Sequence, residues 1–222
     1  MNQVGAAPAG RGADLPAHAD VVVVGAGITG AAIAHHLARR GACVVVVEQS
    51  PRTGAGATGR SGGMVRAWDP DPAIGDLALP SLAVYRDPGR WVSGRAPLHA
   101  VGSVTVAHPD REPALRDAAE QINGALGASA HVVADRDEVA GICLVGGVAL
   151  VEPAAGWVAP VAVTDDWLVQ ATADGAVVCH GVRVHAVAAR GGRPVVRTNA
   201  GTVRAGAVIA ALGPWAADPV PG

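Results

Sequence analysis

The sequence predicts an α/β fold in which a parallel sheet with helices is joined to part of a second, mainly antiparallel domain. Residues 20–24 and 42–48 are rich in consecutive valines, which is typical of strands buried on both faces of a parallel sheet. Residues 28–41 lie between them, repeat apolar side chains at helical spacing and end on Gly41. Together the three segments have the length of a β-α-β crossover.

The middle of the chain predicts helices where apolar residues recur every three or four positions and strands where β-branched residues cluster. In order, the predicted segments are a glycine-rich loop (51–63), a helix (72–85), a strand (102–109), an amphipathic surface helix (111–128), a short strand and turn (131–143), a strand and turn (147–160) and a second helix (161–176). In that second helix Asp165 and Asp166 are expected near the N-terminal turn, where the helix dipole favours carboxylates.

The last part of the chain predicts repeated strands joined by tight turns. One turn is expected at Gly191-Gly192, and residues 199–201 are expected to form a hairpin tip. The apolar residues 208–212 are expected to form a final strand that runs into a glycine turn at Gly213.

Composition excludes several classes of function. The net charge is −2 and Lys and Arg are not clustered, so nucleic acid is not an expected partner. The longest apolar run, residues 21–34, is interrupted by glycines and too short for a membrane span. Residues 1–19 lack the basic and apolar regions of a secretion signal, so a disordered tail and a cytoplasmic protein are expected.

The first motif with chemical meaning is a G-x-G-x-x-G turn between the first strand and the first helix. Gly25 permits the tight turn, Gly27 lets a pyrophosphate approach the backbone, and Gly30 lets helix and strand pack closely. Glu48 follows at the end of the second strand, where a carboxylate can accept both ribose hydroxyls and repels a 2′-phosphate. A glycine turn in an ordinary α/β protein would not explain Glu48, so the sequence predicts dinucleotide binding.

A second glycine-rich loop, residues 53–68, follows directly. So many glycines are entropically costly unless the backbone must contact something, and Thr58, Arg60 and Ser61 add hydrogen-bond donors. The alternative is a flexible surface linker, but apolar residues and Trp68 follow at once. Because nicotinamide enzymes do not need such a loop, it favours a flavin.

The sequence resembles the FAD-dependent amine and amino-acid oxidoreductases typified by D-amino acid oxidase, glycine oxidase and sarcosine oxidase. Five segments carry the resemblance in order: residues 21–50, 54–66 ("GAGATGRSGGMVR"), 77–87, 152–160 ("EPAAGWVAP") and 181–216. It implies a Rossmann-like FAD-binding domain with part of a substrate domain.

The resemblance also implies which residues bind FAD. The glycine turn would contact the pyrophosphate, Glu48 the adenosine ribose, Val184 the adenine, and residues 58–64 the flavin side. Leu212 departs from the alanine common in the family, which is tolerable if only backbone touches the cofactor. The implied cofactor-binding residues are Gly25, Ala26, Gly27, Ile28, Thr29, Gly30, Glu48, Gln49, Thr58, Gly59, Arg60, Ser61, Gly62, Gly63, Met64, Val184, Ala211, Leu212, Gly213 and Trp215.

The expected domain organisation is a tail (1–19), an FAD-binding domain (20–85 and 163–222) and a partial substrate domain (86–162). Family members have longer chains that continue past the turn at Gly213 to complete the substrate domain. We therefore expect a second polypeptide to supply that part, with a small amine or amino acid as substrate.

Catalytic residues are not assigned from the sequence. Arg60 and Arg66 flank the glycine loop and would act either near the flavin ring and substrate or as solvated, phosphate-facing side chains. No metal is expected, because the cysteines have no metal-ligand spacing. The residues interpreted as structural are the helix-surface His35 and His36, the strand residues His180 and His185, the packing residues Trp157 and Trp215, and the buried Cys43, Cys143 and Cys179.

The expected function is that of an FAD-binding subunit, or half, of an oxidoreductase that oxidises the C–N bond of an amine or amino acid. One alternative is a non-catalytic FAD-binding or interaction module. A second alternative, an NAD-dependent dehydrogenase, is disfavoured by the second glycine loop and by the lack of a recognisable catalytic pair.

Overall fold

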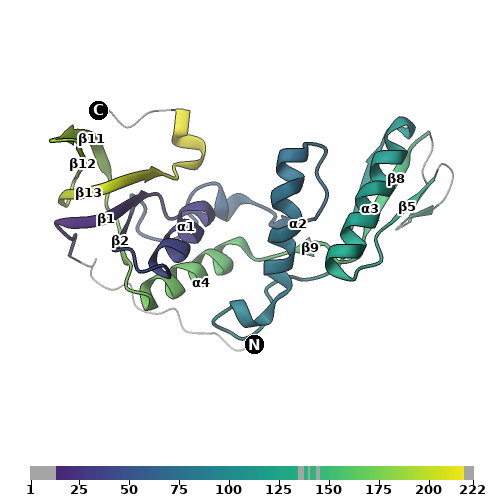
Figure 1. Cartoon of the computed structure of the whole chain (residues 1–222), viewed down its shortest axis with the longest axis horizontal. Coiled ribbons are helices and arrows are strands. Elements are labelled where there is room, and N and C mark those ends of the chain that lie inside the picture. The colour runs from purple at the N-terminus through teal and green to yellow at the C-terminus, as the bar shows by residue number, and fades with distance from the viewer. Residues whose placement is uncertain (1–13, 135–137, 140, 144–145, 218–222) are drawn as a thin grey trace. The chain divides into compact units, whose positions relative to one another are not determined.

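The computed structural model describes residues 14–134, 138–139, 141–143 and 146–217. The chain divides into two compact units, each with its own core. The first unit comprises Met1–Ser61 with Pro160–Gly222, and the second comprises Gly62–Ala159. Figure 1 shows their helices and strands.

The first unit is built on a six-stranded sheet with the order β10-β2-β1-β13-β12-β11. The first four strands in this order are parallel, and β12 and β11 continue the sheet in antiparallel pairing. The predicted parallel sheet with an added hairpin is therefore confirmed. The strands are β1 (His18–Val24), β2 (Val44–Glu48), β10 (Val177–His180), β11 (Val184–Arg190), β12 (Arg193–Thr198) and β13 (Gly201–Ala210).

The valine runs are buried on both faces of this sheet, as their composition predicts. Val22 and Val45 belong to an apolar cluster that also takes in Cys179 and Val203. Side chains alternate along a strand, so the fully buried Val23 points to the other face. There α1 (Ile28–Ala38) contacts β1 and β2 and packs along α4 (Pro160–Ala173), and Figure 1 shows the two helices side by side.

Two predictions in this unit need correction. The strand β1 begins at His18 because the chain already pairs there: the Arg204 N–H donates to the Ala17 carbonyl, 2.9 Å away. The strand thus begins two residues before the predicted start at residue 20, and residues 1–13 lie outside the described part. Helix α4 begins at Pro160, so Asp165 and Asp166 lie in its second turn, and no acidic residue occupies its first turn.

The second unit contains a three-stranded antiparallel sheet with the order β4-β8-β5. Helix α3 (Glu112–Leu126) packs on β5 and β8, as Figure 1 shows, and buries Leu115 against Leu150 of the sheet. The strands are β3 (Met64–Val65), β4 (Ser103–Ala107), β5 (His131–Val133), β6 (Glu138–Val139), β7 (Ile142–Cys143), β8 (Val148–Glu152) and β9 (Gly156–Trp157). The short helices of the chain are η1 (Thr58–Arg60), η2 (Pro88–Arg90), η3 (Pro109–Arg111) and η4 (Gly213–Ala217).

The boundary between the units differs from the expected one. Helix α2 (Pro72–Arg86) belongs to the second unit, because its fully buried Leu82 packs in the same core as Leu115 and Leu150. The second unit therefore begins at Gly62 instead of residue 86. None of the described helices is long and apolar enough to cross a membrane.

Candidate cofactor site

A cavity of about 780 Å³ lies in the first unit, at the carboxyl ends of the parallel strands. In open α/β sheets this edge is where ligands bind. The cavity is lined by the β1–α1 turn, the end of β2, the loop around Gly54–Thr58, the loop after β10 and the segment after β13. Segments far apart in the sequence thus converge on one site.

The β1–α1 turn depends on two of the predicted glycines. Gly25 has a φ of +106°, which L side chains rarely adopt, and a Cβ there would overlap the Ala211 carbonyl oxygen. A Cβ on Gly30 would overlap the carbonyl oxygen of Gly25. Both glycines are therefore required for the close approach of α1, β1 and the end of β13.

The N-terminus of α1 opens on the cavity, and its N-cap residue makes no side-chain hydrogen bond to the helix. Its N-cap residue is Gly27, and the first turn contains no acidic residue. The hydroxyl oxygen of Thr58 accepts the N–H of Ile28 at 3.1 Å. Because a helix leaves its first N–H groups without intrahelical partners, this end is suited to bind an anion such as a phosphate.

Glu48 joins the end of β2 to the β1–α1 turn. Its Oε2 accepts the Ala26 N–H at 2.9 Å, and its Oε1 accepts the Ser50 N–H at 2.8 Å. The half-buried carboxylate is thereby held in one orientation at the wall of the cavity. Two carboxylate oxygens offer about four acceptor sites, so this group can also accept hydroxyls of a ligand.

A second glycine turn repeats the geometry of the first. Residues 54–59 read "GAGATG" where residues 25–30 read "GAGITG". Gly54 has a φ of +72°, and a Cβ on Gly59 would overlap the Gly54 carbonyl oxygen, as Gly30 would overlap that of Gly25. Two turns of one geometry therefore line one cavity.

The segment after β13 completes the lining. The backbone N–H of Trp215 donates to the Leu212 carbonyl at 3.2 Å, and the indole lies over Gly56, where a Cβ would come within 3.0 Å of the ring. Trp215 remains about half exposed. It thus packs on the second glycine turn at the rim of the cavity.

Most of the predicted cofactor-binding residues line this cavity. Those that do are Gly25, Gly27, Ile28, Thr29, Glu48, Gln49, Thr58, Ser61, Val184, Ala211, Leu212, Gly213 and Trp215. Ala26, Gly30 and Gly59 lie in the two turns that shape it, and Arg60 is exposed beside it. Gly62, Gly63 and Met64 belong to the second unit.

Several lining residues are not among those named individually from the sequence. The largest group is Gly54 to Ala57, which belong to the glycine-rich loop predicted to contact the cofactor and to the repeated six-residue motif. Others, such as Val182 and Arg183, come from the loop after β10 and are brought to the cavity by tertiary structure alone. The missed residues are Val24, Val47, Ser50, Gly54, Ala55, Gly56, Ala57, Val182, Arg183, Ala210, Pro214 and Ala216.

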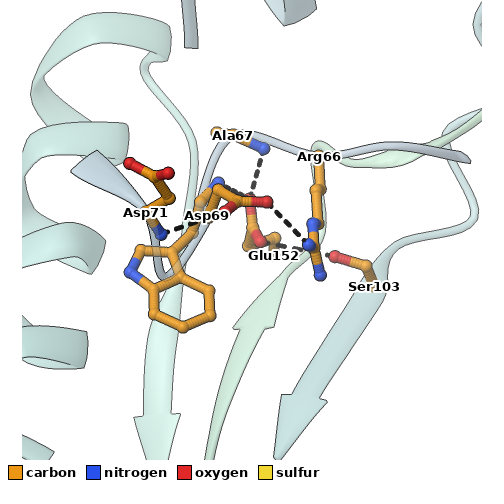
Figure 2. Close-up of polar contacts among 7 residues, drawn as sticks. Arg66, Ala67, Asp69, Asp71, Ser103 and Glu152 are labelled. Carbon is orange, nitrogen blue, oxygen red and sulfur yellow. Dashed lines mark hydrogen bonds and ion pairs between the residues drawn. The ribbon is translucent and has the colours of Figure 1, made fainter. Parts of the chain in front are cut away.

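A separate polar cluster lies in the second unit around Glu152, a residue that the sequence did not single out (Figure 2). Glu152 is 1% exposed, and its Oε2 accepts the N–H groups of Ala67 at 2.8 Å and Trp68 at 3.3 Å. Burial raises the pKa of Glu152, an effect that these N–H groups and the Arg66 guanidinium oppose.

Arg66 forms an ion pair with Asp69 in the same cluster, with 2.9 Å between Nη2 and Oδ2 (Figure 2). The N–H of Asp71 and the Arg66 guanidinium hold the pKa of Asp69 below its ordinary value. Arg66 is therefore a paired arginine in this structure, in contrast to the solvated side chain that was one of its two interpretations.

Two residues interpreted as structural are placed differently from the expectation. His35 is buried at 2% exposure against Trp167, with 4.7 Å between ring centroids, so it is not a helix-surface residue. Cys43, the residue before β2, is exposed, whereas Cys179 is buried as expected. Trp157 stacks on His99 with 4.1 Å between ring centroids, which agrees with its interpretation as a packing residue. The side chain of Cys143 lies outside the described residues.

Similar architectures occur among solved structures of larger proteins. L-Amino acid deaminase from Proteus myxofaciens matches with a TM-score of 0.74 and 22% identity, over 91% of this chain and 47% of that one. L-Proline dehydrogenase from P. horikoshii matches with a TM-score of 0.72 and 24% identity, over 91% of this chain and 55% of that one. Glycine oxidase from Geobacillus kaustophilus matches with a TM-score of 0.68 and 24% identity, over 91% of this chain and 57% of that one.

This chain therefore spans about half the length of these proteins. No protein with a curated description matches it in sequence. The model of one family, described as FAD dependent oxidoreductase, matches residues 20–222. Since that match takes in nearly the whole chain, the protein belongs to the family of FAD-dependent oxidoreductases.

Proposed function

We propose that this chain is the FAD-binding part of an oxidoreductase that oxidises the C–N bond of an amine or an amino acid. The observation that carries the proposal is the cavity of the first unit, which combines two glycine turns, a helix N-terminus and Glu48 in a chain of an FAD-dependent family. The amino-acid chemistry named for the similar deaminase, proline dehydrogenase and glycine oxidase supports this substrate class.

The residues of the cavity fit FAD. The places where a Cβ would fill the space between the turns are glycines, so a pyrophosphate can reach the backbone at Gly27 and at the N-terminus of α1. Glu48 would hold the adenosine ribose, and its charge would disfavour a 2′-phosphate. Bound FAD would supply the hydride acceptor for a C–H bond next to the substrate amine.

The described residues of this cavity supply binding and orientation. Thr58 holds the start of α1 through the Ile28 N–H, so the two glycine turns keep a fixed separation at the pyrophosphate position. Trp215 packs on Gly56 at the rim of the cavity and supports the second glycine turn. Glu48 fixes the ribose end. No acid or base for the chemical step is assigned among them.

FAD binding is tested by purifying the 222-residue chain and recording the flavin spectrum, with Gly30→Ala as the defective variant. The added methyl group would overlap the Gly25 carbonyl, separate α1 from the turn and abolish FAD retention. Gly124→Ala is the matched control: nothing lies within 4 Å of its Cβ position in α3, so FAD retention should be unchanged. Equal flavin content in the two variants would contradict the proposed site.

Reduction of the bound flavin separates an enzyme from a binding module. Bleaching of the flavin band by amino acids or secondary amines under anaerobic conditions supports the oxidoreductase. A bound flavin that none of these compounds reduces supports the non-catalytic module. A colourless chain that binds NAD would favour the dehydrogenase alternative.

A second polypeptide is proposed to complete the substrate domain. The second unit exposes apolar side chains that a partner would cover. Met64 pairs with Trp157 across β3 and β9, and the two are 69% and 42% exposed. Cross-strand partners stand on one face, so they form a contiguous apolar surface.

Co-expression with the neighbouring reading frame tests this pairing. A co-purifying chain that is lost in Met64→Glu but kept in Val169→Glu supports it, since Val169 is an exposed apolar residue of α4 in the first unit. A yellow 222-residue chain that oxidises amines by itself would contradict the need for a partner.

A further inference from the structure

We infer that Asn199 is a positioning residue for the adenosine end of the cofactor, an inference that rests on the proposed FAD site. Asn199 follows β12 at the tip of the β12–β13 hairpin. It does not line the cavity. It acts through the loop of residues 181–183, which joins β10 to β11 and does line the cavity.

Three hydrogen bonds connect Asn199 to this loop. The Arg183 N–H donates to the Asn199 Oδ1 at 2.8 Å, and the Asn199 Nδ2 donates to the Gly181 carbonyl at 3.1 Å. The backbone N–H of Asn199 donates to the Arg183 carbonyl at 3.1 Å. The side-chain amide thus hydrogen-bonds to the backbone of the loop as the peptide group of an adjacent strand would.

The other side of the loop is attached to the end of β2. The Gly181 N–H donates to the Ser50 carbonyl at 3.0 Å, and the Val182 N–H donates to the Glu48 carbonyl at 2.8 Å. The loop is therefore held between the hairpin tip and the strand that carries the ribose-binding carboxylate. Its position relative to Glu48 decides the width of this end of the cavity, where Val182, Arg183 and Val184 contribute to the lining.

The chemistry of the contact requires asparagine. The loop presents one N–H and one carbonyl to the hairpin tip, so the side chain must accept at one atom and donate at the other. An aspartate can only accept when ionised, and an alanine can do neither. The same pairing fixes which end of the amide is oxygen.

Asn199 does not use its side chain to build its own turn. That role belongs to Thr198, whose Oγ1 accepts the Ala200 N–H at 3.1 Å and donates to the Gly201 carbonyl at 2.9 Å. A residue that only stabilised the hairpin would resemble Thr198. Substitutions at these two neighbouring residues therefore distinguish an effect on the hairpin from an effect on the loop, and Thr198→Val is a matched control.

The test measures the affinity of the 222-residue chain for ADP, which carries the adenosine half of FAD without the flavin. We expect Asn199→Ala to weaken ADP binding about tenfold, because it removes two hydrogen bonds that each contribute about threefold in a solvent-exposed setting. Asn199→Asp keeps the acceptor for Arg183 and should show a smaller loss. Thr198→Val should lower the stability of the hairpin and leave the ADP affinity unchanged.

Amide hydrogen exchange supplies a readout that does not depend on a ligand. The Arg183 amide should exchange faster in Asn199→Ala and remain protected in Asn199→Asp and Thr198→Val, because only alanine removes its acceptor. Unchanged exchange in Asn199→Ala would overturn the inference at its first step.

The affinity data distinguish two kinds of failure. If the wild-type chain binds ADP and FAD and Asn199→Ala binds ADP equally well, the inference is wrong and the proposed function stands. If the wild-type chain binds neither compound, the proposed function fails and this inference fails with it. A loss of ADP affinity in Thr198→Val as large as that in Asn199→Ala would reduce Asn199 to a hairpin stabiliser.

Discussion

Among the described carboxyl groups of the second unit Glu152 is the most deeply buried, and its burial raises its pKa. The folded state therefore holds the proton more tightly than the unfolded state. The stability of this unit should fall as the pH rises from the ordinary glutamate value, about 4.3, through the raised pKa, and become constant above it. Glu152→Gln should abolish this slope, because an amide does not titrate and still offers an oxygen to the Ala67 N–H.

Denaturant unfolding at a series of pH values measures this slope, with Glu120→Gln on the exposed face of α3 as the control. Glu152→Ala should cost about 2 kcal/mol or more at every pH, because it leaves the N–H groups of Ala67 and Trp68 without their acceptor. A slope that persists in Glu152→Gln would assign the titration to another group.

Single residues were predictable where a local pattern encodes their role. Gly25, Gly30 and Glu48 occupy the positions in the turn and strand that their spacing indicated. Glu152 and Asn199 were not predictable in this way. Their hydrogen-bond partners lie 84 and 85 residues away for Glu152 and 16 and 18 residues away for Asn199, and only the folded chain brings them together.

The pairing of α1 with α4 contains a buried histidine. Burial lowers the pKa of His35, and His36 and Arg39 lower it further, whereas Asp174 and Asp166 oppose the shift. The folded state binds the proton more weakly than the unfolded state. The stability of the first unit should therefore be full above the ordinary histidine value, about 6.5, and fall as the pH decreases through the interval down to the lowered pKa.

His35→Leu should remove this pH dependence. The substitution also removes a buried Nδ1 that has no hydrogen-bond partner among the described residues, so it should raise the stability by about 1 kcal/mol at neutral pH. His185→Gln, on the exposed side of β11, is the control. The unfolding free energy between about pH 5 and about pH 7 checks both statements, and an unchanged slope in His35→Leu would refute the assignment.

Among the elements, those with an uninterrupted pattern were predicted well. The strands β1 and β2 and the helices α1, α2 and α3 lie where valine runs or helical spacing place them. The start of α4 was misplaced by one residue at Pro160 because proline fits the first turn of a helix as well as a preceding loop. That error also moved Asp165 and Asp166 towards the N-terminus.

At the scale of the molecule, the sequence indicated two domains but placed their boundary too late. The glycine-rich stretch around Gly62 looks continuous, yet the chain passes there from the sheet of the first unit to the core that contains Leu82. A contact between α2 and α3 carries no local signal, because each helix has an apolar stripe that any partner could cover. The sequence therefore does not indicate in which of the two cores the apolar face of α2 is buried.

A final prediction follows from the position of the described cavity, which lies wholly within the first unit. A ligand that binds only the folded first unit stabilises that unit by mass action, by about 2.7 kcal/mol at a free concentration one hundred times Kd. FAD or ADP should therefore raise the unfolding temperature of the first unit and slow amide exchange at the two glycine turns, while the core around Leu115 and Leu150 keeps its exchange rates. Thermal unfolding followed by site-resolved hydrogen exchange measures both effects. Equal protection of both cores would mean that the units unfold as one body, and protection confined to the second core would place the cofactor elsewhere.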